Sequence, residues 1–362
     1  MFKKTLVAAA LATVTFSASA AVPLAGDAFQ VYGQAAGFLH QTNFDGDDST
    51  LSAVIESRIG FRGVVEFENF SPNFIWQIEG GNADNGAKSG QLGARDTYLG
   101  LDFEGVGSIK FGRQLVAAYN LVDWPHSNPG LGNVFDWNND IDAGYQDRAD
   151  NTLRFDSASW GGVNLSATLS NMEKSTDQVV YSAAISYSPI PMLNLHAGYY
   201  GQSDYDGTAV AEPEKYIIDP NTGNITINPV WTLWNAAGGA NQPVEKIDGN
   251  NYAIVGGGLY IDAFTLTAAY KQMDKGDDSQ GAVSATAQYV FDGQYVVKAG
   301  YAETFESDNA TMDDGDRAIT GRLGYILPSA YFYFDVRNYD MNNIKDGNTK
   351  ATNFLLGAEY YF

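Results

Sequence analysis

The chain of 362 residues contains no cysteine and only 11 prolines. The disulfide bonds that stabilise many exported proteins are therefore absent. Basic residues are also scarce. The chain has 21 Lys and Arg but 43 Asp and Glu, which gives a formal net charge of −22 at pH 7. A chain this acidic repels nucleic acid and attracts cations, so we expect no DNA or RNA partner.

Long apolar runs are missing as well. After residue 20, no segment approaches the ~20 consecutive apolar residues that a membrane-spanning helix needs. The first 20 residues instead have the pattern of a secretory signal peptide. Lys3 and Lys4 precede an apolar stretch over residues 6–16, and the small residues Ala18-Ser19-Ala20 follow. We expect cleavage before Ala21, with residues 21–362 forming a single mature domain.

Aromatic residues and glycine are abundant, with 22 Tyr, 20 Phe and 39 Gly, while the mean hydropathy is only −0.22. This combination is typical of a membrane β-barrel, in which every second strand residue faces water. The chain ends on the clearest example of the pattern. Phe354, Leu356 and Tyr360 lie on one face of the expected strand, and Leu355 and Glu359 lie on the other. The aromatic face needs an apolar medium, which we expect to be lipid.

The alternation recurs in about 16 segments, an even number that is typical of bacterial outer-membrane barrels. Short turns, such as Asp292-Gly293, and longer polar loops alternate between them. We therefore predict an all-β fold, a transmembrane antiparallel β-barrel, whose closure removes exposed sheet edges. A soluble β-sandwich or propeller would also alternate, but it would not explain the aromatic strand ends or the terminal Phe362. The predicted strands span residues 29–41, 50–67, 73–80, 95–104, 108–114, 148–156, 162–171, 178–188, 192–203, 250–260, 262–273, 280–291, 294–304, 316–327, 329–340 and 350–362.

Several short motifs, specific as a set, resemble the Gram-negative general porins. They are V-Y-G-Q at residues 31–34, S-R-I-G-F-R-G at 57–63, Y-L-G-L-D-F-E-G-V-G-S-I-K-F-G-R at 98–113, R-A-D-N-T-L-R-F at 148–155, and the terminal Phe362. The resemblance implies a homotrimer of 16-stranded barrels in the outer membrane of a Gram-negative bacterium. Its implied partners are membrane lipid, lipopolysaccharide, and the small hydrophilic solutes and ions that diffuse through it. No cofactor is implied.

The segment between Arg113 and Arg148 is over thirty residues long and has no periodicity. Loops of this length are unusual and are usually functional. In the family that the chain resembles, the third outer loop folds into the barrel and narrows the channel. Here the loop contains no Lys or Arg but several acidic residues, namely Asp123, Asp136, Asp140, Asp142 and Asp147. The basic residues expected to face it are Arg58, Arg62, Arg148 and Arg154, by alternation, and Arg95, by resemblance. Such opposed charges would create a transverse field, and we expect a preference for cations.

Each arginine has a plainer interpretation as a barrel-wall residue paired with a neighbouring acid, such as Arg58 with Glu56. Arg95 also conflicts with strict alternation, which places it on the face of Leu99, so a β-bulge or a position at the strand rim is required.

Two departures from the family pattern stand out. Gln34 occupies a position that is often Lys, and the usual Pro-Glu-Phe-Gly-Gly loop motif is replaced by residues 128–132, N-P-G-L-G.

Other functions have less support. Four residues resemble the start of a Ca²⁺ loop, namely Asp136, Asn138, Asp140 and Asp142, but Ile141 stands where glycine is required, so we predict no metal site. His40, His126 and His196 lie far apart in sequence without recognisable catalytic partners, and we predict no enzymatic activity. The alternatives to a general diffusion channel are a substrate-specific channel, for example for sugars, or a barrel that serves as a surface adhesin or receptor. The long loop at residues 204–249 is a lid, a partner-binding surface or a variable outer loop, and in a substrate-specific channel it would form a binding track with aromatic residues of the pore.

Overall fold

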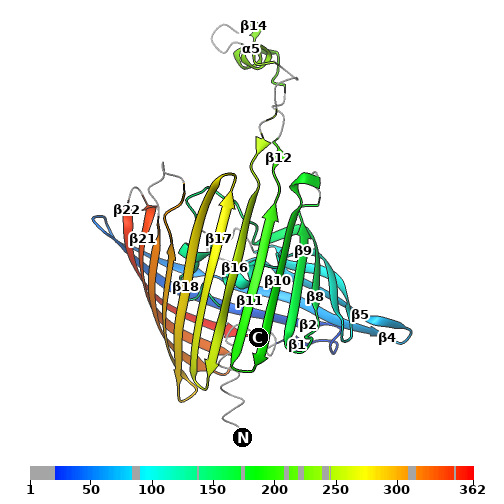
Figure 1. Ribbon diagram of the computed structural model, residues 1–362, viewed down its shortest axis with the longest axis vertical. Coiled ribbons are helices and arrows are strands. Elements are labelled where there is room, and N and C mark those ends of the chain that lie inside the picture. Colours follow the sequence, from blue (N-terminus) through cyan, green and yellow to red (C-terminus); the bar gives the residue numbers. More distant parts are fainter. Residues whose placement is uncertain are drawn as a thin grey trace.

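A computed structural model describes residues 21–83, 90–136, 138–172, 176–207, 212–218, 224–238, 244, 246–308, 315–345 and 348–362. The expected signal peptide lies outside these residues. The described chain forms one closed antiparallel barrel with a short outer module above it (Figure 1). No described helix is long and apolar enough to cross a membrane.

The barrel wall contains 16 strands in the described part of the chain, as predicted. β3 and β4 count as one wall strand, because both pair with β2 in the same register, Gly37 with Ile55 and Gln34 with Arg58. The wall strands are β2 (Gln30–Phe44), β3 (Thr50–Ile55) with β4 (Arg58–Phe67), β5 (Phe70–Gly80), β6 (Leu92–Phe103), β7 (Gly107–Leu115), β8 (Arg148–Ser157), β9 (Val163–Ser170), β10 (Val180–Ile190), β11 (Leu193–Gln202), β16 (Asn250–Ile261), β17 (Phe264–Lys275), β18 (Asp278–Phe291), β19 (Tyr295–Thr304), β20 (Arg317–Leu327), β21 (Ala330–Lys345) and β22 (Asn348–Tyr361). A short strand, β1 (Val22–Pro23), pairs with β2 at the start of the chain.

The first and last wall strands close the barrel. β22 pairs with β2, with Gln34 opposite Tyr361. The backbone N–H of Gly33 donates to the carbonyl oxygen of Phe362 at 2.7 Å, and the N–H of Phe362 donates to the carbonyl of Gly33 at 3.1 Å. This pairing of the first and last wall strands confirms the predicted closure of the barrel.

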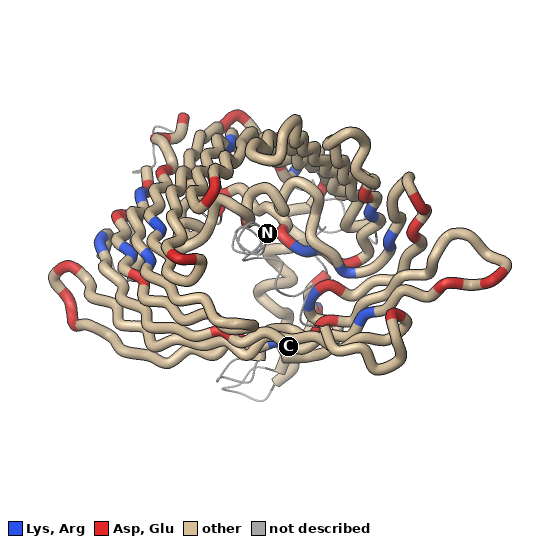
Figure 2. The backbone as a smooth tube through the Cα atoms, turned by 90° about the horizontal axis from the view of Figure 1, so that it is seen from below, with Lys and Arg blue, Asp and Glu red and all other residues tan. Residues whose placement is uncertain are grey.

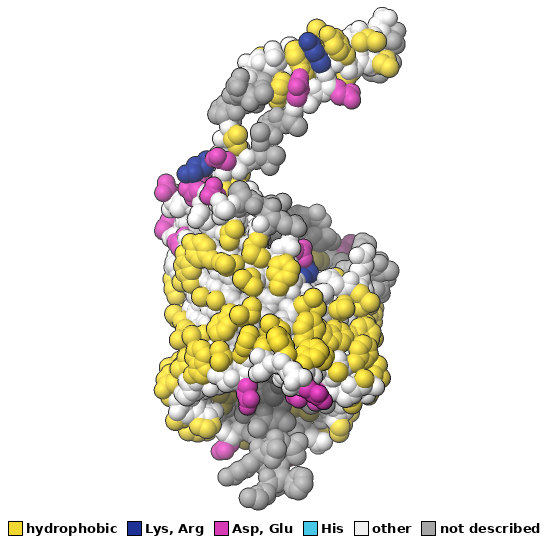
Figure 3. Space-filling view, turned by 90° about the vertical axis from the view of Figure 1, so that its right-hand side faces the viewer, with side chains coloured by type: hydrophobic (Ala, Val, Ile, Leu, Met, Phe, Trp, Pro, Cys, Tyr) yellow, Lys and Arg dark blue, Asp and Glu magenta, His cyan; other side chains and the backbone are white. Residues whose placement is uncertain are grey.

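Alternation along the strands sorts side chains between the two faces of the wall. In β22, Leu356 and Tyr360 are exposed on the outside, whereas Leu355 is buried on the inside. In β19, Val297 is exposed while its neighbours Val296 and Lys298 are buried. The outward residues cover the wall with apolar side chains (Figure 3). An apolar outer surface of this kind suits contact with lipid.

The ends of the barrel differ. At one end the strands are joined by tight turns, such as the one in which Asp292 and Gly293 adopt φ values of 49° and 71°. At the other end the connections are longer. Hairpins that project sideways from the wall have acidic tips (Figure 2). The longest carries a module of β12 (Tyr205–Asp206) with β15 (Lys246–Ile247), β13 (Tyr216–Ile218) with β14 (Ile225–Ile227), and α5 (Pro229–Ala236).

Residues 116–147, here called the inner loop, fold into the barrel between β7 and β8. The inner loop contains α3 (Tyr119–Asp123) and α4 (Gly132–Phe135). Its apolar residues, such as Leu131 and Phe135, are fully buried in a core shared with wall residues of β11, β16 and β17. Glycine permits this close approach at Gly300, where an added Cβ would lie 2.8 Å from Leu131. The inner loop therefore fills one side of the barrel and leaves the other side open.

Candidate functional site

A cavity of about 540 Å³ lies on the open side, between the inner loop and strands β2, β4, β5, β6 and β22. Its walls are strongly charged, with six basic and five acidic residues. The basic residues are Arg58, Arg62, Arg95, Arg148, Lys298 and Arg322, and the acidic residues are Glu56, Glu79, Asp96, Asp123 and Glu359. A molecule inside this cavity would therefore be in contact with fixed charges of both signs.

Arg58 and Arg62 lie on the inward face of β4, where alternation places them. The Arg58 Nε donates to Gln34 Oε1 at 2.8 Å, and the Arg62 Nε donates to Gln30 Oε1 at 3.2 Å. Arg58 is therefore held by a neutral amide rather than by Glu56, the partner that the plainer interpretation suggested. An arginine that is positioned by an amide keeps its charge available to the cavity.

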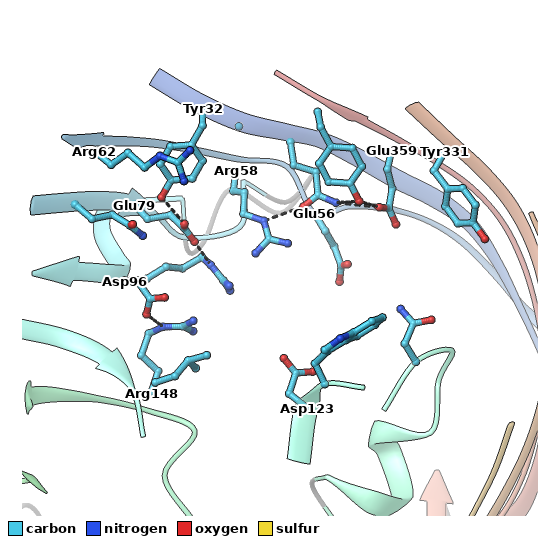
Figure 4. A pocket seen from close by; sticks show the side chains of 18 of the residues that line it. Tyr32, Glu56, Arg58, Arg62, Glu79, Asp96, Asp123, Arg148, Tyr331 and Glu359 are labelled. Atoms are coloured by element: carbon cyan, nitrogen blue, oxygen red, sulfur yellow. Dashed lines mark hydrogen bonds and ion pairs between the residues drawn. The ribbon is translucent and has the colours of Figure 1, made fainter. Parts of the chain in front are cut away.

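Arg95 and Arg148 are paired with acids of the wall. The Arg95 Nε lies 2.5 Å from Glu79, and the Arg148 Nε lies 2.8 Å from Asp96 (Figure 4). A register shift between β5 and β6, after Ile78, reorients the start of β6 and brings Arg95 to the cavity. This irregularity is of the kind that the conflict with alternation required.

Asp123 lies on the inner-loop side of the cavity, across from Arg58 and Arg148 (Figure 4), and Arg95 lines the same cavity. It ends α3, and Trp124 follows it along the edge of the same cavity. Within the described part of the chain, Asp123 forms no ion pair, although Arg95, Arg148 and Arg58 act on its charge. Its side chain is exposed to the lumen, but the surrounding protein removes part of its hydration. This loss of hydration raises the pKa of the carboxyl, and the three arginines lower it again only in part. Asp123 is the predicted loop acid that the structure places opposite the predicted basic residues.

The other four predicted loop acids lie away from this cavity. Asp136 accepts a hydrogen bond from the Tyr119 hydroxyl at 2.8 Å, and Asp140 accepts one from the Gln280 amide at 2.6 Å. Asp142 pairs with Lys275 at 2.9 Å. Asp136 and Asp147 line a second cavity of about 40 Å³ behind the inner loop. These acids thus lie against strands of the wall rather than along the open side.

Arg154 is likewise not among the residues that line the large cavity. Its guanidinium pairs with Asp156 at 2.8 Å and donates to the carbonyl of Leu115 at 2.7 Å. The plainer interpretation, a wall arginine paired with a neighbouring acid, describes this residue. Its contact with Leu115 supports the start of the inner loop.

Lys298 and Arg322 line the cavity but were not singled out from the sequence. The Lys298 Nζ lies 5.5 Å from the centre of the Trp124 ring. Arg322 is buried and binds Asp335 with two hydrogen bonds, at 2.6 and 2.8 Å. The signal in the sequence was a single charged residue at an inward position between apolar ones, as in V-V-K-A at residues 296–299. In a barrel such a residue must face the lumen.

Two of the three histidines meet inside the barrel. The Nε2 atoms of His126, in the inner loop, and His196, in β11, are 2.9 Å apart, and both side chains are buried. Their separation of 70 residues in sequence did not predict this contact. No cluster of three or more His, Asp or Glu side chains suited to a metal ion occurs among the described residues.

Comparison with known proteins gives consistent matches. The profile of the Gram-negative porin family matches residues 7–274. A chitoporin of Vibrio furnissii is 33% identical over 390 residues, an alignment that covers 100% of this chain and 99% of the relative. The anion-selective porin of Comamonas acidovorans has a TM-score of 0.66 at 16% identity and covers 92% of this chain and 99% of its own. In vitro folded OmpT of Vibrio cholerae, in its trimer form, has a TM-score of 0.59 at 17% identity and covers 93% and 100%. The two structures share the fold with this chain.

Proposed function

The chain belongs to the Gram-negative porin family, and from that premise we propose that it forms a water-filled channel for passive diffusion of small hydrophilic solutes and ions. The family and the closed barrel place the protein in the outer membrane. The observation that carries the proposal is the charged cavity between the inner loop and the wall. Members of the family are channels, and we propose no enzymatic activity.

We further propose that the mature chain, residues 21–362, is one domain that assembles as a homotrimer in contact with membrane lipid and lipopolysaccharide. The trimer form of the structurally similar OmpT supports the assembly.

The cavity charges nearly balance, with six basic against five acidic residues. Because the lining has no excess of acids, we propose that a cation preference comes from the position of Asp123 opposite the arginines and from the net charge of −22 on the whole chain.

Ion currents through the purified protein in planar bilayers test the proposal. We expect an open channel and a reversal potential across a salt gradient that indicates weak cation preference. The preference should shrink as salt rises, because the Debye length falls from ~10 Å at 0.1 M to ~3 Å at 1 M. A protein that inserts as a folded barrel and carries no current would contradict the proposed channel.

A second candidate is a saccharide-specific channel. Trp124, Tyr32, Tyr331 and Tyr361 line the same cavity as the charges, and aromatic faces with a few polar groups are typical of small-molecule sites. The name of the similar chitoporin points in the same direction. Chitin-derived oligosaccharides added to the bilayer chamber should then block the ion current in a saturable way.

Two tryptophan variants test the saccharide candidate. Trp124→Ala should weaken the block, whereas Trp160→Ala is a matched control. The Trp160 side chain is exposed and donates to the carbonyl of Gly105, next to the β6–β7 turn and away from the cavity. Current that oligosaccharides leave unchanged in the unmodified protein would favour the general channel.

A further inference from the structure

Lys271 is a charged wall residue that the inner loop covers completely. It lies on β17 and its side chain is 1% exposed. An ammonium group in such a place is costly unless it is hydrogen-bonded. The Nζ atom donates to the backbone carbonyl of Phe135 at 2.5 Å and to that of Asp136 at 3.3 Å. The rings of Phe135 and Tyr252 lie 5.3 and 6.0 Å away, which is within the range of cation–π attraction.

The two carbonyl groups belong to the end of α4, and a hydrogen bond links this end to α3. The Asp136 carboxylate, next to the bound carbonyls, accepts from the hydroxyl of Tyr119 at 2.8 Å. Tyr119 is the first residue of α3, and Asp123 is the last. Contacts therefore run without interruption from Lys271 through Asp136 and Tyr119 to the helix that presents Asp123 to the cavity.

We propose that Lys271 is a positioning residue that fixes the segment bearing Asp123 and Trp124, and thereby sets the aperture and charge selectivity of the channel. The inference rests on the proposed function. Without the ammonium group, the carbonyls of Phe135 and Asp136 and the Asp136 carboxylate lose their buried cation. Unsatisfied buried acceptors and charges are strongly unfavourable, so the loop should shift until water reaches them.

Lys275 provides a matched control on the same strand. It lies four residues further along β17 and therefore on the same face. It also binds the inner loop, through the carbonyl of Asp142 at 2.6 Å and its carboxylate at 2.9 Å. Its side chain is, however, 25% exposed, and Asp142 does not border the large cavity. Lys275 thus shares the chemistry of Lys271 without the connection to α3.

The first experiment compares Lys271→Met and Lys275→Met by single-channel conductance and reversal potential. We expect Lys271→Met to change the conductance by about twofold and to shift the reversal potential, because conduction through a narrow pore follows its lining and radius. Lys275→Met should match the unmodified channel. Equal conductance and reversal potential in all three proteins, or the same change in both variants, would overturn the proposal. If Lys271→Met does not assemble, Lys271→Gln, which keeps one donor group, replaces it.

A second measurement follows the position of α3 directly and does not depend on ion flow. The chain has no cysteine, so Asp123→Cys introduces a single thiol. Its rate of modification by a water-soluble thiol reagent should change in the Lys271→Met background and stay constant in the Lys275→Met background. A rate unaffected by Lys271→Met in folded barrels would refute the positioning role. An unmodified protein without ion current would refute the proposed function, while the thiol rates would still decide the role of Lys271.

Discussion

Asp123 is the acidic residue whose surroundings fit a role in ion selectivity. It lies on the inner-loop side, across from Arg58 and Arg148 (Figure 4), in a cavity that Arg95 also lines. Two of these arginines are already neutralised by Glu79 and Asp96. A carboxylate without its own ion pair contributes more to the field of a narrow aqueous space than one in a pair.

We predict that Asp123→Asn lowers the cation-to-anion permeability ratio, most strongly at low salt, where screening is weak. Because burial raises the pKa of the Asp123 carboxyl, the unmodified channel should lose cation preference on acidification at a higher pH than an ordinary aspartate would, as the carboxylate takes up a proton. The variant should lack this pH response. Reversal potentials at several pH values measure both effects.

The triple variant Asp136→Asn, Asp140→Asn, Asp142→Asn is the comparison. These acids bind Tyr119, Gln280 and Lys275, so their replacement should leave the permeability ratio nearly unchanged. A fall in the ratio equal to that of Asp123→Asn would move the selective region to that part of the inner loop.

At the scale of elements, the inner loop is held by strands that lie far from it in sequence. Wall hydroxyl groups bind its backbone: Ser182 accepts from the N–H of Ala118 at 2.9 Å, and Ser284 donates to the carbonyl of His126 at 2.7 Å. His126 itself meets His196 at 2.9 Å and packs against the Phe135 ring. The docked loop therefore depends on a buried histidine that must stay neutral.

Acid should weaken this docking. Burial, with His196 and Lys298 nearby, lowers the pKa of His126 to about 3. A histidine in an undocked loop has a pKa of about 6.5. Between this pH and the lower pKa of the docked residue, the undocked histidine is protonated and the docked one is neutral. The docking equilibrium is then fully favourable above pH ~6.5 and weakens about tenfold per pH unit below it, until the folded pKa is reached.

We predict that the melting temperature of the folded barrel falls more between pH 7 and pH 5 than that of a His126→Gln variant. Glutamine keeps a hydrogen-bonding group but does not titrate. His196, with Asn194 as its other partner, and Lys298 are retained in both proteins, so the difference reports on His126 together with its contact to His196. Parallel pH dependence in the two proteins would show that His126 does not control docking.

At the scale of the whole molecule, the barrel depends on its last residue for closure. Phe362 exchanges two backbone hydrogen bonds with Gly33, and its ring stacks on Tyr360 at 6.4 Å between centroids. The ring packs so closely on β2 that a Cβ at Gly33 would lie 2.5 Å from it. Closure at this point removes the open edges that lipid does not tolerate.

Deletion of Phe362 should therefore reduce the yield of assembled protein in the outer membrane, while the channels that do assemble should keep normal conductance. Phe362→Ala is the matched control, because it keeps the backbone bonds and removes only the ring. The yield of folded trimer and its single-channel conductance are the measurements. A normal yield after deletion would count against this role.

The sequence alone predicted the fold and much of the wall. Alternation located all 16 wall strands, for example residues 162–171 for the observed β9 (Val163–Ser170), because side chains of an extended chain must alternate between faces. The same rule placed Arg58 and Arg62 on the inward face. It did not detect the interruption between β3 and β4, and only the family resemblance pointed to Arg95.

Only the tertiary structure decided what each residue of the inner loop faces. A segment without periodicity takes its orientation from the surfaces it packs against, and these come from distant parts of the chain. Asp136 lies beside Lys271, 135 residues away, and His126 meets His196, 70 residues away. The inner loop packs on β10, β11 and β16–β21, and the buried side chains of Leu131, Val134 and Phe135 fix which side of the loop meets the wall. As a result, four loop acids lie away from the cavity and Asp123 lies in it.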